Sequence, residues 1–298
     1  MIKKTEKLSP IEQTNNVEGT AEKTKLPNNK RILLVEDNRI SQTIILGVLA
    51  NIYLDADVAE NGIQALQILK DNQKTCRYQL ILMDCQMPEL DGFETTKLIR
   101  SGDVGHHYQS IPIIALTANS LKTDKEKCLS SGMNDYTTKP IDVAILQKKL
   151  CQWLGVRESS LNKIKDTVEH KKAANLLISK NSLTNHEGWN KDDFMKRARN
   201  NTQLAKQLIE LFVEDSPLLK NKLQVVMKQG KEDDIVAFAH KLKGSARDLG
   251  GYHLAEICET IENNSSGVNK VQLDLQYKTL EKEFNLFMKV LQNFTCEL

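Results

Sequence analysis

The chain has 298 residues, of which 40% are hydrophobic and 27% charged, a balance that is typical of globular proteins and excludes a wholly disordered chain. At roughly 150 residues per domain, this length predicts two domains. The 41 basic and 39 acidic residues give a net charge of +2, which disfavours a dedicated nucleic-acid binder because such proteins usually carry a basic excess.

Composition divides the chain into four parts. Residues 1–30 are polar and show no apolar periodicity, which predicts a flexible tail. Residues 31–155 alternate short apolar runs with amphipathic stretches. Residues 156–188 are rich in Lys, Asn and Ser and are interpreted as a linker, whereas residues 189–298 carry helical patterns almost throughout.

Residues 31–155 have the pattern of a parallel α/β sheet. The runs 32–35, 80–83 and 113–116 are apolar at nearly every position, as expected of strands that are covered on both faces. Weaker strands are expected at 56–59 and 135–138, and amphipathic helices at 38–51, 62–71, 91–100, 122–131 and 142–154. Repeated βα units predict a flavodoxin-like, doubly wound, five-stranded parallel sheet.

Residues 189–298 predict an all-α, four-helix bundle. One apolar seam advances by four and three residues through Ile235, Ala239, Leu242, Ala246 and Leu249, and another runs from Leu273 to Leu291. Such seams are typical of bundles. Further helices are expected near 191–199, 202–229 and 252–263. Pro217 lies inside the second of these and is expected to kink it.

The cysteines form no C-x-x-C pair. We interpret them as free, reduced thiols of a cytoplasmic protein, and not as a disulfide framework or a zinc site. No apolar run reaches the roughly 18 to 20 residues of a membrane helix, and the N-terminus has no apolar signal-peptide core.

Polar side chains stand where the predicted strands end. Glu36 and Asp37 follow the first strand, Asp84 ends the third, Thr117 follows the fourth and Lys139 follows the fifth. The carboxyl ends of parallel strands meet at one edge of a sheet, so these side chains are expected to converge. Any one of them alone is more often structural, for example a helix cap, than functional. Five such residues at four strand ends favour a site.

The chemistry of this set is that of phosphoryl transfer. Three carboxylates repel one another unless a cation balances them, and Mg²⁺ suits hard oxygen ligands. Asp84 is the central carboxylate and the candidate nucleophile toward phosphorus. Thr117 and Lys139 could contact the phosphoryl oxygens, through a hydroxyl and an ammonium group respectively.

Residues 31–155 resemble a two-component receiver domain. The motifs are LLVEDN at 33–38, LILMDCQMPELDG at 80–92, ALTAN at 115–119 and GMNDYTTKP at 132–140. The resemblance implies that Asp84 is the phospho-acceptor and that the Lys139-Pro140 bond is cis. Tyr136 matches the aromatic switch residue of the family, although packing at the edge strand would also explain it. The implied Mg²⁺ ligands are Glu36, Asp37, Asp84 and the backbone carbonyl of Gln86.

His240 lies one position off the first helical seam, so it is expected at the edge of the core, facing water. Lys243, Gly244 and Arg247 share its helix face. Arg247 is interpreted as solvated surface. The stretch AHKLKGSARDLGG at 239–251 resembles the histidine phosphotransfer (HPt) motif. That resemblance implies that His240 is a second phospho-acceptor, that Lys243 assists it and that Gly244 leaves room for a partner.

A receiver followed by an HPt domain implies a phosphorelay protein. We expect an upstream histidine kinase and a downstream response-regulator receiver as partners, with Asp84 and His240 exchanging a phosphoryl group with each other or with separate proteins. A flexible linker of this length spans about 32 Å, which permits contact within one chain. No kinase ATP-binding motif or P-loop occurs, so the chain is expected to be a phosphotransfer protein and not a kinase. The alternatives are the C-terminal part of a hybrid sensor kinase and a non-phosphorylated adaptor.

Overall fold

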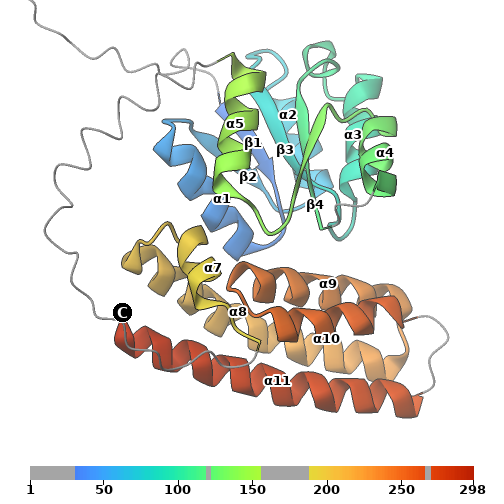
Figure 1. Cartoon of the computed structure of the whole chain (residues 1–298). Helices are drawn as coiled ribbons and strands as arrows, with labels where there is room; N and C mark the ends of the chain where they lie inside the picture. The colour runs from blue at the N-terminus through green and yellow to red at the C-terminus, as the bar shows by residue number, and fades with distance from the viewer. Residues whose placement is uncertain (1–30, 119–121, 156–187, 266–269) are drawn as a thin grey trace, which may run out of the picture.

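The computed structural model describes residues 31–118, 122–155, 188–265 and 270–298. The predicted tail and all but the last residue of the predicted linker lie outside the described residues. Figure 1 shows an α/β part stacked on a helical bundle, with α1 (Arg39–Asn51) between them. Within the described residues, no helix is both long and apolar enough to cross a membrane.

The α/β part contains the predicted parallel sheet. Its strands are β1 (Arg31–Val35), β2 (Ala56–Ala59), β3 (Tyr78–Asp84), β4 (Ile113–Thr117) and β5 (Asp135–Thr138), in the order β2-β1-β3-β4-β5. This confirms the predicted fold. Strand β3 begins two residues earlier than predicted because Tyr78 is buried and its hydroxyl donates a hydrogen bond to Asp57 at 2.7 Å.

Helices cover both faces of the sheet. The helices after α1 are α2 (Gly62–Asp71), α3 (Gly92–Ser101), α4 (Lys122–Ser130) and α5 (Val143–Leu154). Helices α1 and α5 pack on one face, and α2, α3 and α4 on the other. The side chains of Asn38 and Asp142 accept hydrogen bonds from the first turns of α1 and α5 and so cap these helices. A short 3₁₀ turn, His106–Tyr108, was not predicted.

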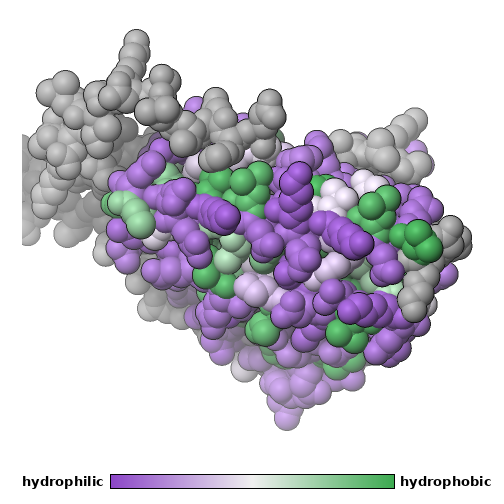
Figure 2. Space-filling view, turned by 90° about the horizontal axis from the view of Figure 1, so that it is seen from below, coloured by the Kyte–Doolittle hydropathy of each residue, from purple (hydrophilic) through white to green (hydrophobic). Residues whose placement is uncertain are grey.

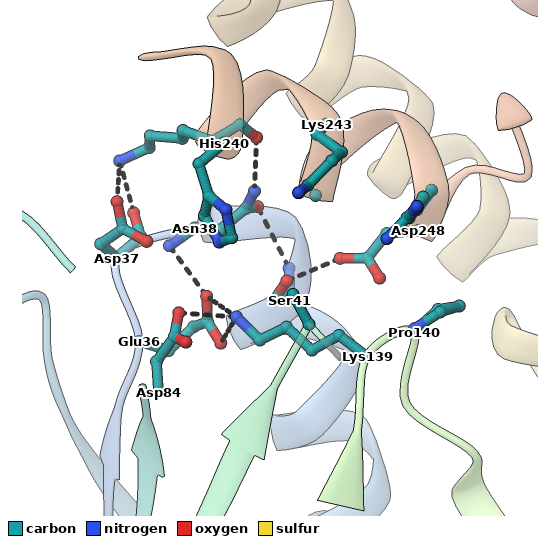
Figure 3. A pocket seen from close by; sticks show the side chains of 14 residues that line it. Glu36, Asp37, Asn38, Ser41, Asp84, Lys139, Pro140, His240, Lys243 and Asp248 are labelled. Carbon is teal, nitrogen blue, oxygen red and sulfur yellow. Dashed lines mark hydrogen bonds and ion pairs between the residues drawn. The ribbon is translucent and has the colours of Figure 1, made fainter. Parts of the chain in front are cut away.

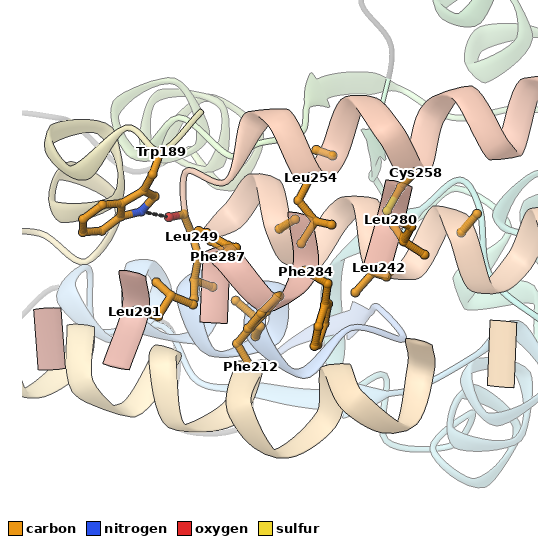
Figure 4. Close-up of a cluster of buried hydrophobic side chains, with 14 of the residues drawn as sticks. Trp189, Phe212, Leu242, Leu249, Leu254, Cys258, Leu280, Phe284, Phe287 and Leu291 are labelled. Carbon is orange, nitrogen blue, oxygen red and sulfur yellow. Dashed lines mark hydrogen bonds between the residues drawn. The ribbon is translucent and has the colours of Figure 1, made fainter. Parts of the chain in front are cut away.

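The bundle consists of α7 (Lys191–Arg197), α8 (Thr202–Gln229), α9 (Glu232–Asp248), α10 (Tyr252–Asn263) and α11 (Lys270–Glu297). All five residues of the seam predicted for α9 are completely buried. Figure 4 shows the core, in which Phe212 packs against Phe284 and Phe287 from α11. Helix α8 continues through Pro217. The bundle face seen in Figure 2 is mostly hydrophilic, with hydrophobic side chains in small groups.

Helix α1 contributes to two hydrophobic cores. Ile45, Val48 and Leu49 pack against the sheet, whereas Ile40 and Ile44 belong to the core of the bundle. Ile40 and Ile44 are each only 2% exposed. Ile40 and Ile44 are the residues of the α/β part that belong to the bundle core among the described residues, and burial of each isoleucine side chain contributes about 1.5–3 kcal/mol.

Gly92 is required where α3 begins beside the functional edge of the sheet. A Cβ atom at this position would lie 2.0 Å from the Asp84 carbonyl oxygen, which no side chain can tolerate. We expect Gly92→Ala to lower the free energy of unfolding of the α/β part by about 1–3 kcal/mol. This free energy is measured by titrating the protein with urea and following the loss of the NMR signals of folded β3 and β4. Gly47→Ala on α1 is the control, since its nearest neighbour would be 4.0 Å away; an equal loss there would contradict the account.

Candidate functional site

Three carboxylates converge at the carboxyl edge of the sheet, as predicted. Glu36 and Asp37 follow β1, and Asp84 ends the neighbouring strand β3. One oxygen from each of them lies within 4.8 Å of the others. Glu36 and Asp84 are buried, whereas Asp37 lies in an intermediate position at the rim.

Lys139 partly balances these charges. Its Nζ lies 2.6 Å from Asp84 Oδ2 and 2.7 Å from Glu36 Oε2. Burial alone would lower the pKa of Lys139, but the two carboxylates outweigh burial and raise it. The pKa of Glu36 is raised by its burial and then by the charge of Asp84, with Lys139 opposing the shift. A protonated Lys139 thus bridges Glu36 and Asp84, and it does not neutralise the charge of Asp37.

Thr117 and Gln86 support the edge of this site. The main-chain amide of Lys139 donates to the Thr117 carbonyl at 2.7 Å. The main-chain amide of Gln86 donates to Asp84 Oδ1 at 3.2 Å. The Lys139-Pro140 bond is cis, as predicted. Carboxylates at this spacing are hard oxygen donors of the kind that Mg²⁺ prefers, so the donor set fits that ion.

The Tyr136 ring lies beneath two ammonium groups, at 5.5 Å from Lys125 Nζ and 5.4 Å from Lys149 Nζ. These cation–π contacts stabilise the half-buried ring at the edge strand β5. They give the ring a packing role, and its switch role stays a prediction.

His240 on α9 is held by a carboxylate that sequence analysis missed. Its Nδ1 lies 3.0 Å from Glu262 Oε1 on α10, and the other oxygen of Glu262 accepts from Lys243. Burial would raise the pKa of Glu262, but the hydrogen bonds and charges of His240 and Lys243 lower it below its ordinary value. A carboxylate acceptor keeps the hydrogen on Nδ1 and leaves the lone pair on Nε2.

One expectation for this face was wrong, and another stays a prediction. Lys243 is 4% exposed and pairs with Glu262, the carboxylate that also binds His240, and its assisting role stays a prediction. Arg247 is not solvated surface, because it forms a 2.9 Å ion pair with Glu259 and is 21% exposed. The signal for Glu262 in the sequence was an acid next to the apolar residue Ile261, which is buried in the core of the bundle. Its partner could not be identified without the pairing of α9 and α10.

The two predicted sites meet across one cavity. Its lining includes Asp84 and Lys139 from the α/β part, and His240 and Gly244 from α9. Figure 3 shows the His240 side chain projecting from α9 toward Asp84 and Lys139. The cavity is narrow, with a volume of about 20 Å³. It has room for about one water molecule, which needs roughly 10–15 Å³. The expectation that His240 faces open water was therefore wrong, because the α/β part covers it.

A row of polar contacts fixes α9 on α1. Asn38 Nδ2 donates to Ser245 Oγ at 2.8 Å, and Ser41 Oγ donates to Asp248 Oδ2 at 2.6 Å. At the start of α1, Arg39 also forms an ion pair with Asp215 on α8, with 2.9 Å between the Arg39 guanidinium nitrogen and Asp215 Oδ1. Burial raises the pKa of Asp248, although the hydrogen bond from Ser41 opposes this.

Two family models match the chain. The response regulator receiver domain matches residues 32–151, and the Hpt domain matches residues 207–292. Hybrid signal transduction histidine kinase B of Dictyostelium discoideum is 44% identical over 137 residues, which is 43% of this chain and 7% of that protein. Signal transduction histidine-protein kinase BarA of Escherichia coli is 27% identical over 250 residues, 84% of this chain and 25% of BarA. The chain thus spans a quarter or less of these relatives.

Two solved structures resemble the α/β part. The receiver domain of sensor histidine kinase PA1611 from Pseudomonas aeruginosa, with a magnesium ion in its active-site cleft, is 42% identical and has a TM-score of 0.38; the match covers 43% of this chain and 98% of that one. The complex of Saccharomyces cerevisiae Ypd1 with the receiver domain of Ssk1 gives 37% identity and a TM-score of 0.38, over 42% of this chain and 88% of that one.

The chain therefore contains a response regulator receiver domain followed by an Hpt domain. This pair of domains supports a role in phosphorelay signalling.

We expect Glu262→Gln to reduce the fraction of His240 imidazole that carries its hydrogen on Nδ1, because a neutral amide oxygen is a weaker acceptor than a carboxylate. The ¹⁵N chemical shifts of the imidazole ring report this fraction directly. Glu259→Gln is the matched control, since Glu259 pairs with Lys243 and Arg247 and is not an ion-pair partner of His240 among the described residues. An unchanged tautomer in Glu262→Gln would contradict the positioning role of Glu262.

Proposed function

We propose that Asp84 and His240 exchange a phosphoryl group within one chain, in the docked arrangement of the receiver and the Hpt domain. The observation that carries this proposal is the single small cavity lined by both side chains. Each proposed acceptor has a charged neighbour from its own domain. Lys139 lies beside Asp84, and Glu262 lies beside His240.

The transfer is a displacement at phosphorus. Nε2 of His240 attacks the phosphorus atom of an aspartyl phosphate, a nitrogen–phosphorus bond forms, and the bond to the Asp84 oxygen breaks. The electron pair stays on the Asp84 carboxylate, which Lys139 stabilises at 2.6 Å. Because the chemistry is reversible, the same groups serve transfer from His240 to Asp84.

The surrounding residues hold charge as the group moves. The Nδ1 hydrogen bond to Glu262 stabilises the positive charge that develops on the imidazole ring, and Lys243 keeps that carboxylate ionised. Thr117 ends β4 at the same edge of the sheet, and its hydroxyl would contact a phosphoryl oxygen. Glu36, Asp37, Asp84 and the Gln86 carbonyl would hold Mg²⁺, which supplies neutralisation of the phosphoryl oxygens when bound.

External partners complete the relay in this proposal. A histidine kinase would load one acceptor, and a response-regulator receiver would unload the other. Both acceptors are enclosed by the docked arrangement, with 16% of the His240 side chain and 3% of the Asp84 side chain exposed. Partners would therefore exchange with the undocked chain.

A second candidate shares this chemistry. The similarity to BarA over 84% of this chain also suits the same two domains as one portion of a hybrid sensor kinase. A non-phosphorylated adaptor is the third candidate, and it is disfavoured because the acids and Lys139 expected of a working receiver are all present and assembled.

The test is to incubate the chain with Mg²⁺ and a ³²P-labelled small acyl phosphate, and to separate base-stable phosphohistidine from base-labile aspartyl phosphate. We expect label to enter at Asp84 and then to appear on His240. Asp84→Asn should abolish both signals, and His240→Gln should leave only the aspartyl phosphate.

Intramolecular transfer is distinguished by mixing and dilution. The rate constant for the rise of phosphohistidine should be independent of chain concentration. A mixture of the Asp84→Asn and His240→Gln chains, which permits transfer only between molecules, should transfer more slowly on dilution. Label that never leaves Asp84 would refute exchange within the chain, and an Asp84 that never accepts label would favour the adaptor.

A further inference from the structure

Lys241, the residue after His240, forms an ion pair across the domain interface. Its Nζ lies 3.0 Å from Asp37 Oδ2 and donates to the Asp37 carbonyl oxygen at 2.7 Å. The main chain of the same residue is also tied to the receiver, because Asn38 Nδ2 donates to the Lys241 carbonyl at 3.4 Å. Both ends of Lys241 are thus positioned by the loop that follows β1.

The pairing completes the charge balance of the acidic site. Lys139 bridges Glu36 and Asp84, and no contact links it to Asp37 among the ion pairs of the described residues. Asp37 is the acid that the receiver leaves to an outside cation. In the docked arrangement, the Hpt domain supplies that cation through Lys241. The Lys241 side chain is 31% exposed and the Asp37 side chain is 12% exposed.

We propose that Lys241 is an internal competitor of Mg²⁺ for the Asp37 carboxylate, so that docking of the Hpt domain lowers the Mg²⁺ affinity of the receiver. The inference rests on the Mg²⁺ site assigned under the proposed function, but it does not depend on phosphoryl transfer. It gives Lys241 a regulatory role at the acidic site that is separate from the acceptor role of its neighbour His240.

Thermodynamic linkage makes the competition reciprocal. If docking lowers the Mg²⁺ affinity by some factor, Mg²⁺ weakens docking by the same factor. Mg²⁺ would therefore favour the undocked chain, in which Asp84 and His240 are open to external partners. A low supply of Mg²⁺ would favour the docked chain.

The competition weakens Mg²⁺ binding without excluding it. Lys241 has two acceptors on Asp37, and the hydrogen bond to the main-chain carbonyl is independent of the carboxylate. The carboxylate can serve a metal ion while the carbonyl still holds the ammonium group. Repulsion between Mg²⁺ and the Lys241 ammonium group then weakens Mg²⁺ binding. For charges so close at a half-buried site, we expect the Mg²⁺ affinity to fall about tenfold.

The test is a calorimetric titration of the whole chain with Mg²⁺, with no phosphoryl donor present. Lys241→Met should bind Mg²⁺ about tenfold more tightly than the unmodified chain. Lys289→Met is the matched control, because it removes the same charge at a residue that is exposed on α11 and has no ion pair with Asp37 among the described residues. The control should leave the Mg²⁺ affinity unchanged.

A second background isolates the effect of docking. Ile44→Glu places a charge in the apolar contact between α1 and the bundle, and it leaves the residues of α1 that pack on the sheet intact. In Ile44→Glu, the Mg²⁺ affinity should already be raised, and adding Lys241→Met should change it by less than about twofold.

Three results would overturn the proposal. One is equal Mg²⁺ affinity in Lys241→Met and the unmodified chain. Another is a full tenfold effect of Lys241→Met in the Ile44→Glu background, which would mean a general charge effect without docking. The third is no Mg²⁺ binding to any variant. Failure of phosphoryl transfer between Asp84 and His240 would not change the reading of these titrations, since they contain no phosphoryl group.

Discussion

The burial of opposite faces of α1 is the constraint on which the rest of the structure depends. One face of this helix completes the core of the receiver, and Ile40 and Ile44 on the other face enter the core of the bundle. Because the functional edge of the sheet leads directly into α1, fixing this helix against α8 and α9 also fixes Asp84 opposite His240. The apolar contact supplies the free energy of docking, and the polar contacts around it set the register.

Asn38 links local folding to that register. Its side-chain oxygen accepts from the amides of Ile40 and Ser41, which begins α1, and its side-chain nitrogen donates to Ser245 on α9. One side chain thus caps the helix and aligns the partner domain. The same short segment contains Glu36 and Asp37, so the placement of the acids, the start of α1 and the position of the Hpt domain are coupled.

The two proposed acceptors share one kind of charge pairing. Each has a partly buried partner of suitable charge from its own domain, which is Lys139 for Asp84 and Glu262 for His240. Asp37 is different, because its partner Lys241 comes from the other domain. Among the three acids, Asp37 is thus the one with an ion-pair partner from the Hpt domain in the described residues, and it is among those expected to hold the metal.

The sequence was sufficient to predict the sheet, the seam of α9 and the convergence of the acids. Those features follow from local apolar periodicity and from the rule that parallel strands end at one edge. It could not predict that Lys243 is buried against Glu262, since this depends on the pairing of two helices. Nor could it predict that the carboxyl edge of the sheet covers His240. Ile44 has the same apolar character as Ile45, and only the docked bundle distinguishes the two.

The most direct test of the central claim is the rate of Asp84-to-His240 transfer at high dilution in Ile44→Glu, compared with Ala50→Glu on the exposed end of the same helix. If docking through α1 brings the two acceptors together, Ile44→Glu should reduce the concentration-independent rate by at least about tenfold, while labelling of Asp84 continues and Ala50→Glu behaves as the unmodified chain. An undiminished rate in Ile44→Glu, with Asp84 still labelled, would contradict the docked arrangement as the route of transfer.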